Sequence, residues 1–125
     1  MRPRLSLLLS VALATCLFLP AVLQAQVNPF RGSRSPGLSP EDNQMLFESV
    51  ARLNAAEPSQ VGSSDSWNNP QTRSSGTSTI LRVLHSGGMA CHLVRHHIVV
   101  AGRQPGHNYR LTWCLTPSGE WKIKG

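Results

Sequence analysis

The sequence contains few of the patterns on which enzymatic catalysis depends. It has no Gly-x-Ser-x-Gly elbow, which the common α/β serine hydrolases use to present their nucleophile. It also has no glycine-rich phosphate loop and no closely spaced Cys-x-x-Cys pair, which excludes the usual nucleotide-binding and thiol redox motifs. These absences predict a protein that is not an enzyme and that carries no cofactor.

Acidic and aromatic residues are also scarce. Six Asp and Glu stand against twelve Lys and Arg, and aromatic residues make up 6% of the chain. The basic residues form no run and do not alternate with aromatic rings, so nucleic-acid binding is not expected. The modest positive charge is typical of a solvated surface, although it could hold the protein near anionic lipid or polysaccharide.

The first 25 residues have the three parts of a secretory signal peptide. Arg2 and Arg4 make a positively charged start, residues 7–19 are mostly apolar, and Ala25 is a small residue at a plausible cleavage site. We therefore expect export. Cleavage after Ala25 removes Arg2 and Arg4 and leaves ten basic against six acidic residues, a net charge of +4.

Two alternatives for this segment concern the membrane. The apolar run is shorter than the roughly 20 residues that a spanning helix needs, so a permanent transmembrane anchor is not expected. Residues 13–16, Leu-Ala-Thr-Cys, look something like a bacterial lipoprotein box, which would attach a lipid to Cys16. Because Thr15 is bulkier than the usual residue and apolar residues follow Cys16, we expect cleavage at Ala25, with peripheral outer-membrane association as the alternative.

Cleavage would leave Cys91 and Cys114 as the only cysteines. In an oxidising compartment two cysteines most simply form one disulfide bond. On the chain-entropy model such a bond contributes about 3 kcal/mol, which matters in a domain with a small core.

The N-terminal half of the mature chain is predicted to hold one helix. Residues 26–38 are rich in proline and glycine, which predicts a disordered lead. A helix is predicted over residues 40–55, with Ser39 as its N-cap and Pro40 in its first turn. One face of this helix carries an apolar stripe, formed by Leu46, Val50 and Leu53. We expect the stripe to pack on the sheet of the same domain.

The rest of the chain is predicted to be a loop followed by a sheet. Residues 56–77 are rich in Ser, Asn and Gly and should form a loop that Trp67 anchors to the core. Alternating or β-branched segments follow, at residues 78–85, 90–100, 107–115 and 120–124. Short turns between them favour antiparallel neighbours. The predicted fold is α+β, a four-stranded antiparallel meander sheet over residues 78–124 with one N-terminal helix, in a single domain of residues 39–125.

The two cysteines also predict the register of the central hairpin. If Cys91 lies opposite Cys114, most large apolar residues of the two strands fall on one face, and the disulfide falls on the other. This register places Arg95 opposite Arg110, a pair of like charges that should repel slightly.

The flanking turns predict further neighbours. A two-residue Gly-Gly turn sets Leu81 beside Val94 and Leu84 beside the disulfide, and the Pro-Ser turn sets Trp121 there as well. The apolar patch that results would be covered by the helix or by Trp67.

The histidines suggest a metal site as an alternative. In the predicted register His92, His96 and His107 share one face, so two or three imidazoles could lie close enough to bind zinc or copper. No Asp or Glu lies in the strands that carry them, and the same face packs the core. Histidines without metal are therefore expected, and a periplasmic metal-binding protein is the alternative function.

An ordered set of residues resembles a known family. The set comprises Trp67, Pro70, Gly76, Cys91, Thr112-Trp113-Cys114 and Gly119-Glu120-Trp121. Over residues 60–124 it resembles the C-terminal domain of bacterial outer-membrane surface antigens, the 17 kDa surface antigen type. The sequence departs from that family at His92 and Leu115, where arginine is usual, and it has no clear Gly-x-x-x-Gly apolar hairpin.

The resemblance implies a bacterial envelope protein with a small β-rich domain and no assigned enzymatic activity, in the periplasm or at the outer membrane. It also implies structural anchors at Trp67, Pro70, Gly76, Gly119 and Trp121. We therefore expect a non-enzymatic envelope protein with a structural or binding role. Its partner would be an envelope component, whether protein, lipid or polysaccharide.

Overall fold

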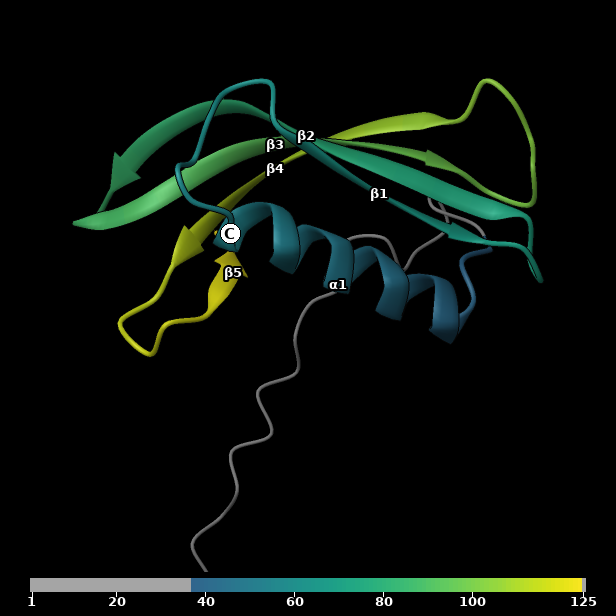
Figure 1. The fold of residues 1–125 in the computed structure, drawn as a ribbon, viewed down its shortest axis with the longest axis horizontal. Coiled ribbons are helices and arrows are strands. Elements are labelled where there is room, and N and C mark those ends of the chain that lie inside the picture. The colour runs from purple at the N-terminus through teal and green to yellow at the C-terminus, as the bar shows by residue number, and fades with distance from the viewer. Residues whose placement is uncertain (1–36, 125) are drawn as a thin grey trace, which may run out of the picture.

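A helix followed by a five-stranded sheet makes up residues 37–124, the part that the computed structural model describes (Figure 1). The helix is α1 (Pro40–Ala55). The strands are β1 (Ser64–Asn69), β2 (Ser74–Ser86), β3 (Met89–Val99), β4 (His107–Leu115) and β5 (Trp121–Ile123). Each strand pairs antiparallel with the next, and the sheet curls around the helix. The predicted helix, antiparallel meander and disulfide are confirmed.

The helix begins where the sequence predicts. Ser39 accepts a hydrogen bond from the backbone N–H of Asp42 (3.0 Å), and the Asp42 carboxylate accepts one from the Ser39 N–H (2.9 Å), with Pro40 in the first turn. The same buried carboxylate accepts hydrogen bonds from the Asn69 and Thr72 side chains, beside the β1–β2 turn. Burial raises the pKa of Asp42, but these hydrogen bonds together lower that pKa below its ordinary value. One carboxylate thus fixes the helix N-terminus against the sheet.

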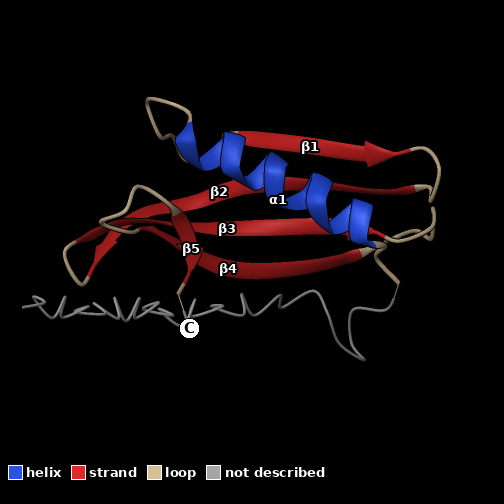
Figure 2. Cartoon of the chain, turned by 90° about the horizontal axis from the view of Figure 1, so that it is seen from below, coloured by secondary structure: helices blue, strands red, loops and turns tan. Residues whose placement is uncertain are grey.

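The sheet has one more strand than predicted (Figure 2). β1 and the first residues of β2 lie within residues 56–77, so the prediction of a loop there is wrong. β1 has the polar sequence Ser-Asp-Ser-Trp-Asn-Asn, of which only Trp67 and Asn69 are buried. Its extended conformation depends on pairing with β2, which the local composition does not reveal.

The register of the central hairpin is as predicted. Cys91 lies opposite Cys114 and forms the disulfide, with Cα atoms 4.1 Å apart. Arg95 lies opposite Arg110, and the pairing continues to Ile98 opposite His107. The disulfide and the apolar alternation therefore indicated one and the same pairing.

A β-bulge changes one predicted neighbour. The register of β2 against β3 shifts between Ile80 and Arg82, so Ile80, and not Leu81, lies opposite Val94. Beyond the bulge, Leu84 lies opposite Cys91, as predicted.

A second irregularity moves Trp121 away from the disulfide. The Gly119 N–H donates to the Thr116 carbonyl (2.9 Å), and Gly119 has a φ of 86°, a conformation that favours glycine. This glycine adds a residue to the turn, so Trp121 lies opposite Leu115, and Lys122 takes the predicted place beside Cys114. The expected patch of Trp121 beside the disulfide is wrong for this reason.

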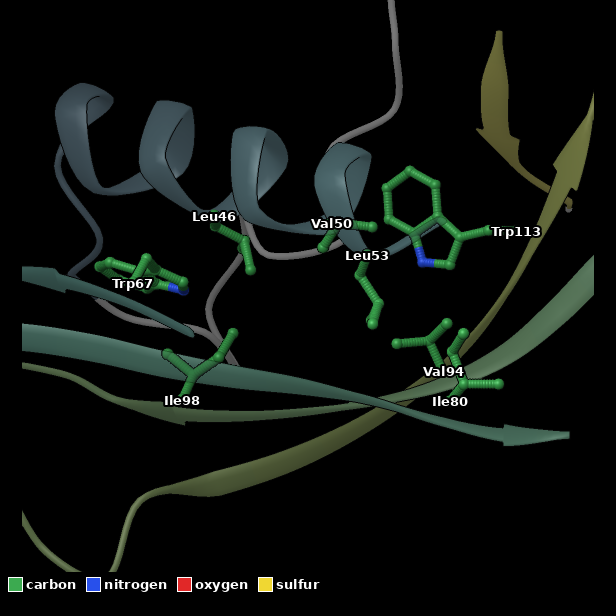
Figure 3. Close-up of a cluster of buried hydrophobic side chains, with 8 residues drawn as sticks. All are labelled: Leu46, Val50, Leu53, Trp67, Ile80, Val94, Ile98 and Trp113. Atoms are coloured by element: carbon green, nitrogen blue, oxygen red, sulfur yellow. The ribbon is translucent and has the colours of Figure 1, made fainter. Parts of the chain in front are cut away.

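The core lies between α1 and the concave face of the sheet (Figure 3). Its buried members are Leu46, Val50, Leu53, Trp67, Ile80, Val94, Ile98 and Trp113. The apolar stripe of the helix packs here, as predicted. Trp67 lies across from Gly76, where an added Cβ would be 2.4 Å from the indole Nε1. The helix and Trp67 therefore cover the face opposite to the disulfide, and not the disulfide as expected.

Several predictions fall outside the described residues. The signal peptide at residues 1–25, the lipid attachment at Cys16 and residues 26–36 of the lead belong to that part of the chain. Leu38, which was included in the lead, packs against the core cluster. Between residues 37 and 124 no helix combines the length and the apolar character needed to cross a membrane.

Candidate functional site on the outer face of the sheet

His96 is a core residue with both ring nitrogens in hydrogen bonds. The Trp113 indole N–H donates to His96 Nε2 (3.1 Å), so that nitrogen must be unprotonated. The proton therefore lies on Nδ1, which donates to the Ser78 hydroxyl (2.7 Å). Burial lowers the pKa of His96 to about 4, because a charged imidazole would lose its hydration there. A neutral His96 joins three strands at the centre of the core.

His92 is also buried on the helix face. Its ring stacks on Trp121 with centroids 4.4 Å apart, and its Nδ1 lies 2.9 Å from Asn54 Oδ1 at the end of the helix. Burial lowers the pKa of His92 more than the nearby Glu57 carboxylate raises it. The Asn54 amide nitrogen is buried and has no hydrogen-bond partner among the described residues. Sequence patterns do not predict this contact, because 38 residues separate Asn54 from His92.

The three histidines considered for metal binding are not brought into one site. His92 and His96 are four residues apart on one strand, a separation of about 13 Å. His107 is exposed at the start of β4, opposite Ile98. Within residues 37–124 no group of three or more His, Cys, Asp and Glu side chains could hold a metal ion. The geometry gives the metal-binding alternative no support.

The opposite surface of the sheet has a different composition. We define the outer face as the sheet face that points away from α1; direct strand partners form rows across it. One row consists of Ser64, Thr79, Arg95 and Arg110, and the next consists of Ser66, Thr77, His97 and Asn108. On the other side lie a row of Arg82, Leu93 and Thr112 and a row of Leu84, Cys91, Cys114 and Lys122.

The outer face is basic and has no carboxylate in these rows. Arg82, Arg95 and Arg110 are exposed. The ion pairs among the described residues are Arg52 with Asp65 (2.9 Å) and Lys122 with Glu120 (3.3 Å), so neither pair involves these three arginines. Asp65 lies on the helix face, since its partner Ser78 is buried there. The positive charge of the outer face is therefore largely uncompensated.

Neutral hydrogen-bonding groups surround the arginines. The Ser66 and Thr77 hydroxyls are 2.8 Å apart, and His97 Nδ1 lies 3.1 Å from Asn108 Oδ1. No Trp, Tyr or Phe belongs to the rows, because Trp67, Trp113, Trp121 and Tyr109 all take helix-face positions in the register. The surface can therefore bind anions and hydroxyl groups, and the imidazole of His97 is the one ring in these rows.

The other residues predicted as anchors lie in turns or on the helix face. Pro70 is exposed in the turn after β1, Gly76 accommodates the Trp67 ring, and Gly119 forms the bulged turn before β5. The Cys91–Cys114 disulfide is buried within the outer face. One feature of the basic surface could be predicted from the sequence. The register that places Cys91 opposite Cys114 also places Arg95 opposite Arg110.

Comparisons with protein-family models, with curated proteins and with solved structures found no match to this chain.

Proposed function

We propose that this protein is a non-enzymatic protein of the bacterial cell envelope that binds an envelope component through the outer face of its sheet. The observation that carries the proposal is the contrast between the two faces. The buried histidines of the helix face are used in the core, whereas the outer face presents exposed arginines without carboxylate partners. Such a surface on a disulfide-linked sheet suits recognition of an anionic partner.

The envelope location rests on the sequence. Residues 1–25 have the pattern of a signal peptide, and the paired cysteines fit an oxidising compartment. The resemblance to bacterial outer-membrane surface antigens of the 17 kDa type supports the same location, in the periplasm or at the outer membrane. A role in binding or in support of another envelope component follows from that location and from the basic face together.

Cell fractionation tests the location. The full chain with a C-terminal tag should appear in the periplasmic or outer-membrane fraction, with residues 1–25 removed. A Cys16→Ser variant should fractionate in the same way if cleavage follows Ala25, and should shift to the soluble fraction if Cys16 carries a lipid. Retention of the uncleaved chain in the cytoplasm would refute the proposal, and crosslinking in whole cells would identify the component bound.

A further inference from the structure

We propose that Arg95 and Arg110 form the centre of a binding site for an acidic polysaccharide, in which the two guanidinium groups hold its carboxylate or phosphate groups. The inference rests on the proposed binding role and gives that role a ligand chemistry. The two side chains are like charges that the fold keeps together, and no ion pair within residues 37–124 compensates them.

The two arginines form one of the closer cross-strand pairs of the central hairpin. Antiparallel partners alternate between hydrogen-bonded pairs and closer, non-hydrogen-bonded pairs. The Cα separation of 4.1 Å identifies Cys91 and Cys114 as the closer kind. Arg95 and Arg110 are each four residues along from these cysteines, in unbroken register, so they are also of the closer kind, with Cα atoms about 4.5 Å apart. Both guanidinium groups can therefore reach one anion.

Nothing in the described residues neutralises this pair. Like charges placed directly opposite each other on a sheet are destabilising. Neither arginine takes part in an ion pair within residues 37–124, and no Asp or Glu occupies an outer-face position in β1 to β5. An anion bound between them would remove the repulsion, because a guanidinium group donates two parallel hydrogen bonds to a carboxylate or phosphate.

The neighbouring side chains favour a polymer rich in hydroxyl groups. The row of the two arginines continues into Thr79 and Ser64, and the adjacent row brings His97 and Asn108 beside them. These groups can donate to and accept from sugar hydroxyls around a central charged group. The exposed Arg82 lies in the next row along β2, on the side of the arginine row opposite to His97 and Asn108, and would meet a further acidic group of a repeating polymer.

Two other anionic partners fit the surface less well. Single-stranded nucleic acid is bound by stacking of successive bases on several aromatic rings, and the outer-face rows hold no Trp, Tyr or Phe and only one imidazole, that of His97. Peripheral membrane proteins insert Trp, Phe or Leu side chains among the lipids, whereas the arginine row is polar. The sheet also curls around α1, so the outer face is convex and touches a flat bilayer over a small area (Figure 1).

The test measures binding of the full purified protein to two acidic polysaccharides: polygalacturonate, which carries carboxylates, and a phosphomannan, which carries phosphates. Neutral dextran, a single-stranded oligonucleotide and phosphatidylglycerol vesicles complete the set of probes. The comparison uses the double variant Arg95→Gln/Arg110→Gln. The matched control is Arg73→Gln/Arg103→Gln, which removes the same charge from exposed turn residues at one end of the sheet.

We expect the parent protein to bind polygalacturonate or the phosphomannan, the stronger of the two identifying the acidic group, and not to bind neutral dextran. The Arg95→Gln/Arg110→Gln variant should bind at least about tenfold more weakly and depend less on salt, while the control variant should change by less than about threefold. The thermal midpoint of the Arg95→Gln/Arg110→Gln variant should not fall, because repulsion is removed.

Three results would overturn the inference: no binding of either acidic polymer, equal weakening in both double variants, or tighter binding of the oligonucleotide or the vesicles. These outcomes are separate from the test of location. If the protein fractionates with the envelope but binds neither polymer, only the proposed ligand is refuted. If the protein is cytoplasmic and binds the polymers, only the proposed envelope function is refuted.

Discussion

A buried imidazole that must stay neutral makes stability depend on pH. His96 is fully buried, and its Nε2 accepts from the Trp113 indole, so protonation would break that hydrogen bond and place a charge in the core. An unfolded histidine binds a proton near pH 6.5, whereas folded His96 does so near pH 4. Between these values the unfolded state binds more protons, so stability is complete above pH 6.5 and falls as the pH drops.

We therefore predict that the free energy of unfolding decreases by about 3 kcal/mol as the pH falls from 6.5 towards 4, with His92 adding to the decrease. Urea denaturation at several pH values, followed by tryptophan fluorescence, measures it. A His96→Gln variant should be less stable at pH 7 and should have a flatter pH profile. If the profile of the variant kept the slope of the parent protein, another group would carry the pH dependence.

The β1–β2 pair depends on one glycine facing one tryptophan. Trp67 lies opposite Gly76 and its ring occupies the space where a side chain would start, with Nε1 2.4 Å from an added Cβ. We predict that Gly76→Ala lowers the free energy of unfolding by about 1–3 kcal/mol, because the indole must leave its position in the core. Denaturant unfolding of the variant measures this loss.

A double-mutant cycle separates the clash from any general effect on the strand. In a Trp67→Leu background the side chain that faces Gly76 is smaller. Gly76→Ala should therefore lower the free energy of unfolding much less than it does in the parent protein. An equal cost in both backgrounds would show that strand conformation, rather than the ring, requires the glycine.

The elements differ in how far local sequence could predict them. α1 has its cap, first-turn proline and apolar stripe within sixteen residues, and the β3–β4 register has two cysteines to fix it, so both were predicted. β1 was missed because its polar composition matches a loop and its strand form comes from β2. The register errors at Leu81 and Trp121 each arise from one extra residue in a bulge, which alternation of apolar residues does not locate.

The same distinction holds for the candidate site. His92, His96 and His107 attracted attention by residue type, but their contacts come from distant segments such as Ser78 and Asn54. The outer face is defined by which residues of five strands share a row, and only the β3–β4 part of that register could be derived from the sequence.

For the whole molecule, the disulfide and the core stabilise opposite faces of one sheet. The sulfurs lie within the outer face, whereas α1 packs on the other face. We predict that Cys91→Ala/Cys114→Ala stays folded but loses about 3 kcal/mol of unfolding free energy, the loop-closure contribution for a separation of 23 residues. Circular dichroism checks the fold, and urea denaturation checks the loss.

The matched comparison is Cys91→Ala alone, which breaks the same bond and leaves one thiol. Both variants should lose similar stability if loop closure is the main contribution. An unfolded double variant would show instead that the apolar core between α1 and the sheet is too small to hold the fold without the bridge.

The residues of β4 that pair with β5 are Trp113–Leu115, so the earlier part of β4 forms an edge of the sheet. There the backbone groups of Asn108 and Arg110 point away from β3, and no strand within residues 37–124 pairs with them. An unpaired strand edge can form hydrogen bonds with a strand of another molecule, and a charged side chain on the edge disfavours this pairing. Arg110 therefore has a second consequence: in an antiparallel pairing of two copies centred on this residue the two guanidinium groups would lie opposite each other, so the residue proposed to bind an acidic polymer would also disfavour self-association through this edge.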